Sequence, residues 1–171
     1  MLYCTGAEMK PKLDVIIDES AATQLAGFID KFDPKMAKFI RDVRAALRKR
    51  FPTAIELVYD NYNFFVIGYC STPRASDCLV SLVAHAKGVG ICFYYGAKLP
   101  DPHKILQGSG NQVRSIRLSS AKDILKPEVE ALFVAANETA KVPLPVTGKG
   151  KLVIQSISAK QRPRRVPSKN T

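Results

Sequence analysis

Two segments near the start of the chain carry apolar residues at helical spacing, and we predict a helix for each. In residues 21–32 the apolar side consists of Leu25, Phe28, Ile29 and Phe32. In residues 34–50 it consists of Met36, Phe39, Ile40, Val43 and Leu47. Ser20 is placed to cap the first helix, and Asp33 and Pro34 suit the N-cap and the first position of the second.

From residue 54 onward, β-branched and aromatic residues dominate and turns interrupt them. This pattern predicts five strands, at residues 54–60, 63–70, 78–86, 89–97 and 112–120. The short connections between most of them favour an antiparallel meander and leave no room for crossover helices. A last helix, whose main body starts at Pro127, then has an apolar stripe of Val129, Leu132, Phe133, Ala136 and Ala140.

These elements predict an α+β domain at residues 20–141, with helices from both ends packed on one face of a five-stranded antiparallel sheet. Residues 1–19 form a lead-in, within which 14–20 are either a short strand or irregular chain. Residues 142–171 form a basic extension, in which 151–157 are a candidate sixth strand at the sheet edge and the end is expected to be disordered. An exposed edge strand can also pair with a neighbouring molecule, so a homo-oligomer stays an alternative.

The segment 104–118, KILQGSGNQVRSIRL, decides between a nucleotide-binding loop and a turn. Phosphate-binding loops place glycines between a strand and a helix, whose first N–H groups hold the anion. Here Gly108 and Gly110 precede a predicted strand, and Asn111 and Gln112 stand where a P-loop has its lysine and hydroxyl. We therefore predict a turn with positive φ angles, which removes the main argument for a nucleotide-handling enzyme.

Composition changes this picture mainly through charge. The chain has 171 residues, of which 46% are hydrophobic, and this length suits one domain with an appendage. The sequence has no apolar run near roughly 18 residues and no signal-peptide pattern, so we expect a cytoplasmic protein with no membrane span. The net charge is +11, and residues 142–171 contribute seven basic residues and no acidic one.

Three cysteines, Cys70, Cys78 and Cys92, lie among apolar residues and form no C-x-x-C pair. We expect them to be reduced and buried. A disulfide between Cys70 and Cys78 is the alternative, if the two face each other across a hairpin.

Polar and aromatic residues near the predicted turns form a candidate ligand-binding set, which comprises Asp60, Asn61, Asn63, Arg74, Tyr94, Tyr95 and Arg114. Aspartate and asparagine at a turn either fold it through their own backbone bonds or line a polar pocket. Arg74 is close enough in sequence to pair with Asp77. The pocket we predict lies at one sheet edge and gathers Tyr94 or Tyr95 with Asp60 and Arg74.

Basic side chains form two candidate anion-binding groups. One is the polar face of the helix at residues 34–50, with Lys38, Arg41, Arg44 and Arg48. The other is in the tail, with Arg162, Arg164 and Arg165. Binding of nucleic acid or another polyanion to them would weaken with salt, because counterions are released. The alternative is that these charges are merely solvated.

Several strings in a fixed order resemble the YdhG-like family of domains of unknown function. They are ELVYDNYN, VIGY, TPRASD, GAKLPDP and GSGNQVRSIRL, and the resemblance covers about residues 22–140. It implies an α+β domain with an antiparallel sheet and helices from both ends on one face. Some members of the wider family are similar to bacterial frataxin-like proteins that deliver iron, so the resemblance makes iron binding a further alternative.

The residues themselves point to no catalytic set, metal site or cofactor. Ser109 lacks the outer spacing of a nucleophile elbow, and nothing marks His85 or His103 as a base. Iron sites favour clustered carboxylates or imidazoles, whereas the helix at 34–50 has one acidic residue among seven basic ones. The sequence therefore favours a non-enzymatic module that binds a small molecule or a protein through one sheet face or edge.

Overall fold

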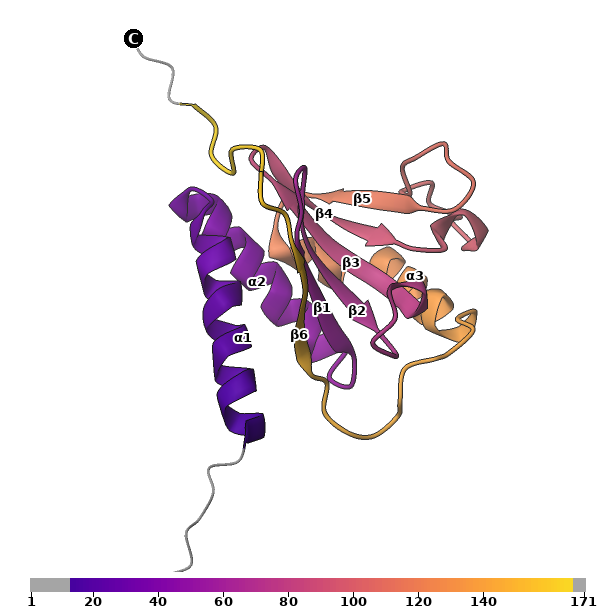
Figure 1. Cartoon of the computed structure of the whole chain (residues 1–171). Coiled ribbons are helices and arrows are strands. Elements are labelled where there is room, and N and C mark those ends of the chain that lie inside the picture. The colour runs from indigo at the N-terminus through magenta and orange to yellow at the C-terminus, as the bar shows by residue number, and fades with distance from the viewer. Residues whose placement is uncertain (1–12, 168–171) are drawn as a thin grey trace, which may run out of the picture.

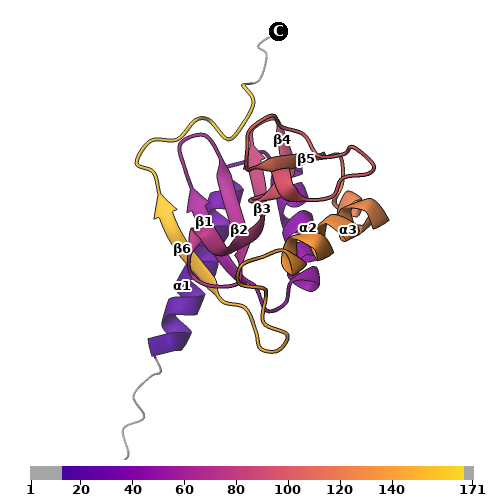
Figure 2. The same ribbon diagram turned by 90° about the vertical axis from the view of Figure 1, so that its right-hand side faces the viewer.

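The structure is a computed structural model that describes residues 13–167, with side chains described from residue 20 onward. Its helices are α1 (Leu13–Asp30), α2 (Pro34–Arg50) and α3 (Pro127–Glu138), and its 3-10 helices are η1 (Ala75–Asp77), η2 (Gly96–Lys98) and η3 (Ala121–Leu125). Its strands are β1 (Ile55–Asp60), β2 (Phe65–Cys70), β3 (Cys78–His85), β4 (Gly88–Phe93), β5 (Arg114–Leu118) and β6 (Leu152–Ile157). Figures 1 and 2 show these elements from two sides.

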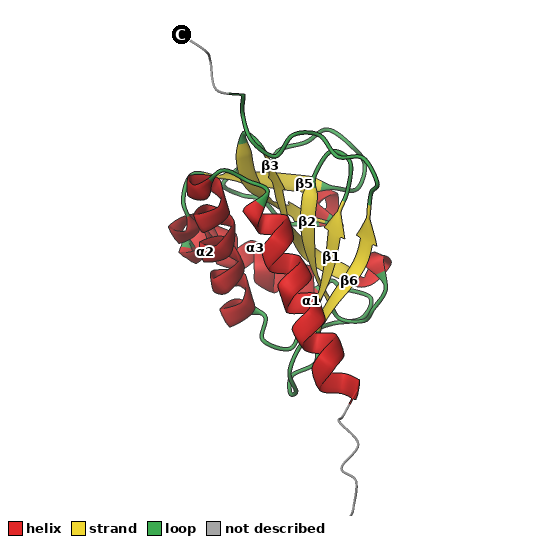
Figure 3. Ribbon diagram, turned by 60° about the vertical axis from the view of Figure 1, so that its left-hand side comes forward, coloured by secondary structure: helices red, strands yellow, loops and turns green. Residues whose placement is uncertain are grey.

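One sheet holds all six strands in the order β5-β4-β3-β2-β1-β6. The predicted antiparallel meander is confirmed for β1 to β5, in which each strand pairs with the next one along the chain. The three α-helices lie on one face of the sheet, as Figure 3 shows, and no α-helix of residues 13–167 covers the other face. The α+β class and the helices on one face were thus predicted correctly.

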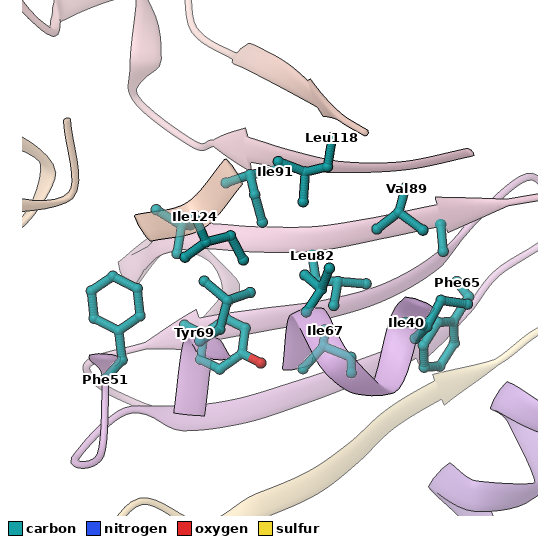
Figure 4. Close-up of a cluster of buried hydrophobic side chains, with 14 of the residues drawn as sticks. Ile40, Phe51, Phe65, Ile67, Tyr69, Leu82, Val89, Ile91, Leu118 and Ile124 are labelled. Atoms are coloured by element: carbon teal, nitrogen blue, oxygen red, sulfur yellow. The ribbon is translucent and has the colours of Figure 1, made fainter. Parts of the chain in front are cut away.

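The hydrophobic core lies between the sheet and the helices. Alternate residues of each central strand point into it, so that Ile67 pairs with Leu82 and Leu82 pairs with Ile91 in one fully buried row. Figure 4 shows this row together with Ile40 of α2 and the ring of Tyr69. A second, smaller cluster of Leu57, Cys70 and Cys78 lies on the helix-free face.

The sheet is mixed, which corrects the prediction of a purely antiparallel one. The sixth strand exists, but β6 pairs with β1 in parallel. The chain after α3 passes back to the start of β1 before β6 begins, as Figure 2 shows, and that return sets the parallel direction.

The start of α1 corrects a second prediction. Residues 14–20 are helical, and Ser20 is inside the helix, where its Oγ accepts a hydrogen bond from Gln24 Nε2 at 3.4 Å, so that it does not cap it. The run Val15–Ile17 has high strand propensity, but such preferences are worth less than about 1 kcal/mol per residue and a continuing helix overrides them. The predictions for residues 1–12 lie outside the described residues.

The predicted start of α2 at Asp33 and Pro34 and the predicted turn at Gly108 are both confirmed. Asp33 caps α2 by accepting a hydrogen bond from Met36 N at 3.1 Å, and Pro34 follows it. Gly108 has a φ of 123°, and the chain after Gly110 leads into β5 rather than into a helix. The glycine-rich segment is therefore a turn. Within residues 13–167, no helix has the length and apolar character that crossing a membrane requires.

Gly150 is needed where the chain enters β6. Its N–H donates to Pro52 O at 2.9 Å, and a Cβ added at this position would lie 1.8 Å from the carbonyl oxygen of Ala54. The carbonyl oxygens of Pro52 and Ala54 belong to the backbone, so they cannot move away by a side-chain rotation. Only glycine lets β6 approach β1 at this point.

We expect Gly150→Ala to lower the free energy of unfolding by about 2 kcal/mol, because overpacking against fixed backbone forces the strand away. Gly110→Ala is the matched control, since no atom lies within 4 Å of its Cβ position. Urea unfolding followed by circular dichroism would measure both. Equal stabilities of the two variants would contradict the argument.

Candidate functional site

The helix-free face of the sheet has a groove of about 430 Å³ over strands β2 to β5. Its floor follows one row of paired residues, because Val66 pairs with Val83, Val83 with Gly90, and Gly90 with Arg117. Side chains of paired residues lie on the same face of a sheet. The row therefore runs from two apolar side chains, over a glycine, to an arginine.

Glycine is required in the middle of this row. A Cβ at Gly90 would lie 2.9 Å from the carbonyl oxygen of Ile116 in the neighbouring strand β5. The missing side chain also leaves the surface open between Val83 and Arg117. The groove thus follows from the register of the strands and from a single position without a side chain.

The polar end of the groove is built by the β3–β4 turn and by β5. Arg117 Nη2 donates to the carbonyl oxygen of Lys87 at 3.2 Å, and its guanidinium lies 3.5 Å from the Cβ position of Gly88. The His85 ring meets the ring of Phe64 edge to face, with centroids 5.9 Å apart. Burial, and then the charges of Arg117 and Lys87, lower the pKa of His85. A permanent cation therefore stands beside an imidazole that is neutral at pH 7.

The next row across the same face consists of small side chains. Ser81 pairs with Cys92, and Cys92 pairs with Ser115, which lines the groove together with Cys92. Burial raises the pKa of the Cys92 thiol, so it stays protonated at neutral pH. This row offers hydroxyl groups and a neutral thiol.

Cys70 and Cys78 are opposite each other in the β2–β3 pair, as the alternative prediction required. Both are buried free thiols. A hydrogen bond from Cys70 lowers the pKa of Cys78, and the same bond raises that of Cys70. The prediction of reduced and buried cysteines holds for this pair, while Cys92 is only half-buried.

The predicted ligand-binding set does not form one pocket. Asp60 is at the end of β1 that meets Phe65, whereas Tyr94 and Tyr95 follow the far end of β4. Strand direction alternates in a meander, so the ends of the first and fourth strands lie at opposite ends of the sheet. Arg74 precedes η1 at the same end as the two tyrosines.

Two members of the set at that far end, Tyr95 and Arg114, have side-chain hydrogen bonds within the protein. Tyr95 donates its hydroxyl hydrogen to Ser76 O at 3.0 Å. Arg114 Nη1 donates to the carbonyl oxygens of Val113 and Gly110, the first at 2.8 Å. Asp77 accepts from Thr72 Oγ1 at 2.6 Å, and within the described residues it forms no ion pair with Arg74.

Asp60 is a fully buried carboxylate that holds the C-terminal segment. Its Oδ1 accepts from Arg164 Nη2 at 3.0 Å, and its Oδ2 pairs with Lys31. Gln161 Nε2 donates to the backbone oxygen of Asp60 at 3.0 Å. Residues 159–167 belong to the end that was expected to be disordered, but these contacts fix their course, because a buried charge needs its partner. Arg164 is therefore an internal residue and is not available to an external anion.

Two asparagines complete the turn after β1. Asn61 accepts a hydrogen bond from Ser156 Oγ at 3.1 Å, which links the turn to β6. Asn63 is exposed. The turn thus serves the structure, as one of the two interpretations of these residues proposed.

The basic face of α2 is matched by carboxylates. Arg44 and Arg48 both bind Glu56, at 2.8 Å and 2.6 Å. Lys38 pairs with Asp42, and Arg41 pairs with Asp30. The sequence suggested an open cationic face, but each of these four side chains already pairs with one of three carboxylates within the protein.

His85, Gly90 and Arg117 are the main residues that sequence reasoning did not assign to a site. The sequence does contain a pattern that points to them. Several residues of β2, β3 and β4 whose side chains lie on this face are small, among them Gly68, Ser81, Gly88 and Gly90. A strand face with few large side chains leaves space above the sheet.

Among the described residues, no three histidine, cysteine, aspartate or glutamate side chains gather closely enough to hold a metal ion. Iron binding therefore stays a prediction drawn from the resemblance. Comparison with protein-family models finds no match, and searches of curated proteins and of solved structures find none either. Function is therefore inferred from the geometry of the groove.

Proposed function

We propose that this domain binds a small organic anion with an apolar body in the groove on the helix-free face, as a non-enzymatic module. The observation that supports this most directly is the row Val66–Val83–Gly90–Arg117, which places an apolar surface next to a single arginine. The volume of about 430 Å³ is within the range of small-molecule sites.

The charge of Arg117 suits a carboxylate or a phosphate. Within the described residues its guanidinium takes part in no ion pair, and the one side-chain hydrogen bond it forms is to a carbonyl oxygen. The planar guanidinium can bind an oxyanion through two parallel bonds. The neutral imidazole of His85 and the hydroxyl of Ser115 add polar partners at the same groove.

Phenyl phosphate and 2-naphthoate are suitable probes, because each joins an aromatic body to an anion. In ¹H–¹⁵N NMR titrations of the full chain we expect the amide signals of Val66, Val83 and Gly90 to shift. Arg117→Gln should weaken binding about tenfold or more, as loss of a charged hydrogen bond does. Arg74→Gln, at the opposite end of the sheet, is the control. Shifts confined to other regions, or equal affinities of the two variants, would contradict the proposal.

The pH dependence of binding gives a second test. A bound anion beside Arg117 offsets the positive charges that help to lower the pKa of His85, so the complex holds more protons than the free protein. We therefore expect affinity to rise as the pH falls below about 6.5, and to level off once His85 is protonated in the free protein as well. NMR titration of the His85 imidazole with and without 2-naphthoate measures both pKa values. A ligand-bound pKa equal to or below the free one would argue against an anion at this position.

A further inference from the structure

Exposed rings and cations gather in a strip at the hairpin end of the sheet, where β1 meets β2 and β3 meets β4. We define this strip by the residues Tyr62, Phe64, Lys87, Arg117, Arg162 and Arg165. Tyr62 and Phe64 are 50% and 44% exposed, which is unusual for two large rings in one short turn. Phe64 and Arg117 also line the groove, whereas Tyr62, Lys87, Arg162 and Arg165 lie outside it.

Both rings are held in place. The turn closes through a hydrogen bond from Asn61 N to Phe64 O at 3.0 Å. The guanidinium of Arg162 lies 5.7 Å from the centre of the Tyr62 ring, and Phe64 packs edge to face on His85. Rings that are ordered in the free protein lose little freedom when a ligand stacks on them.

The C-terminal segment brings two arginines to this end. The anchoring of Arg164 on Asp60 directs the chain over the β1–β2 turn, and Figure 2 shows that course. Arg162 N donates to Tyr62 O at 2.9 Å. Arg165 Nε donates to Lys31 O at 3.2 Å. Both side chains are exposed.

The cations of the strip have no carboxylate partner among the described residues. Arg165 and Arg117 donate to carbonyl oxygens, and Arg162 faces a ring. The nearby carboxylates are occupied, since Asp60 binds Lys31 and Arg164 while Asp30 binds Arg41. This end of the molecule is thus electropositive, unlike the face of α2 that was one of the two anion-binding groups predicted from the sequence.

We propose that this strip binds single-stranded nucleic acid, with phosphates on Arg162, Arg165 and Lys87 and bases stacked on Tyr62 and Phe64. Alternation of cations and fixed, exposed rings is the chemistry by which proteins hold unpaired strands without sequence preference. A duplex hides its base faces inside the stack, and a generic polyanion has none. The two rings therefore favour an unpaired strand.

The full chain is to be titrated into fluorescently labelled 12-residue single-stranded DNA and RNA, with anisotropy as the readout at several salt concentrations. We expect Tyr62→Leu to weaken binding about tenfold, through lost stacking, and to leave heparin binding unchanged. Arg162→Gln with Arg165→Gln should weaken binding of both and reduce the slope of log affinity against log salt by about two.

Lys38→Gln with Lys49→Gln is the matched control, because it removes two positive charges on α2, none of whose residues belongs to the strip. If this control weakens oligonucleotide binding as much as the arginine pair does, the proposal is wrong. It is also wrong if Tyr62→Leu has no effect, or if the chain binds anionic vesicles but not oligonucleotides. Tyr62, Arg162 and Arg165 do not line the groove, so binding of 2-naphthoate should be normal in these variants, and either proposal can fail without the other.

Discussion

Replacing Glu56 by alanine is expected to lower the free energy of unfolding by about 3 kcal/mol. Glu56 belongs to β1 but points toward the helices, where only 2% of it is exposed. Its carboxylate accepts two hydrogen bonds from Arg44, at 2.9 Å and 2.8 Å, and one from Arg48 at 2.6 Å. The variant leaves Arg44 half-buried without its anion, and this uncompensated charge is the main cost.

Tyr69 is a further member of this network around Glu56. Its hydroxyl donates to Glu56 Oε1 at 3.2 Å, and its pKa is raised well above the ordinary value, chiefly by burial and then by the charge of Glu56. Urea unfolding would compare Glu56→Ala with Glu130→Ala, whose carboxylate forms a more exposed pair with Arg50. We expect less than about 1 kcal/mol for the second variant. Similar losses for both would mean that Glu56 is not a buried anchor.

The local parts of the fold were predictable because each depends on neighbours in the sequence. The Asp33–Pro34 helix start and the Gly108 turn follow from backbone preferences. The order of the first five strands follows from their short connections. The direction of β6 was not predictable in this way, because it depends on where the chain after α3 meets the sheet.

The site was less predictable, although part of the error was avoidable. Asp60 ends the first predicted strand and Tyr94 lies near the end of the fourth. The chain reverses three times between them, so the predicted meander alone places them at opposite ends of the sheet. The pattern of β1 was ambiguous for a physical reason. One face of β1 carries two acidic residues, Glu56 and Asp60, beside Val58, and the other face carries Ile55, Leu57 and Tyr59. Judged by polarity alone, the face with the two acidic residues would be expected to point to solvent. Arginines and a lysine from distant segments reverse that choice by pairing with both carboxylates.

Asp60→Ala is expected to have the largest effect on stability, about 4 kcal/mol. The carboxylate is fully buried, and the side chain of its partner Arg164 is only 3% exposed. Without Asp60 the arginine must either stay buried without an anion or leave with the whole C-terminal segment. Arg164→Ala should cost a similar amount, and the double variant should cost less than the sum by about 1–3 kcal/mol, because the two residues act as a pair. Urea unfolding of the four proteins measures this coupling.

Variants of Asp60 and Arg164 can show whether the C-terminal segment is held by the ionic attraction between these two residues or by the packing of their side chains. Arg164 Nε is buried with no hydrogen-bond partner among the described residues, so the ion pair is incompletely satisfied. A combined Asp60→Leu and Arg164→Met variant should therefore recover most of the stability that either alanine variant loses, since apolar replacements of buried ion pairs are often neutral. It should also keep oligonucleotide binding, because a buried apolar side chain in place of Arg164 would still direct Arg162 to the ring of Tyr62. Stability without oligonucleotide binding would show that the charge of Arg164, and not the path of the chain, positions the strip.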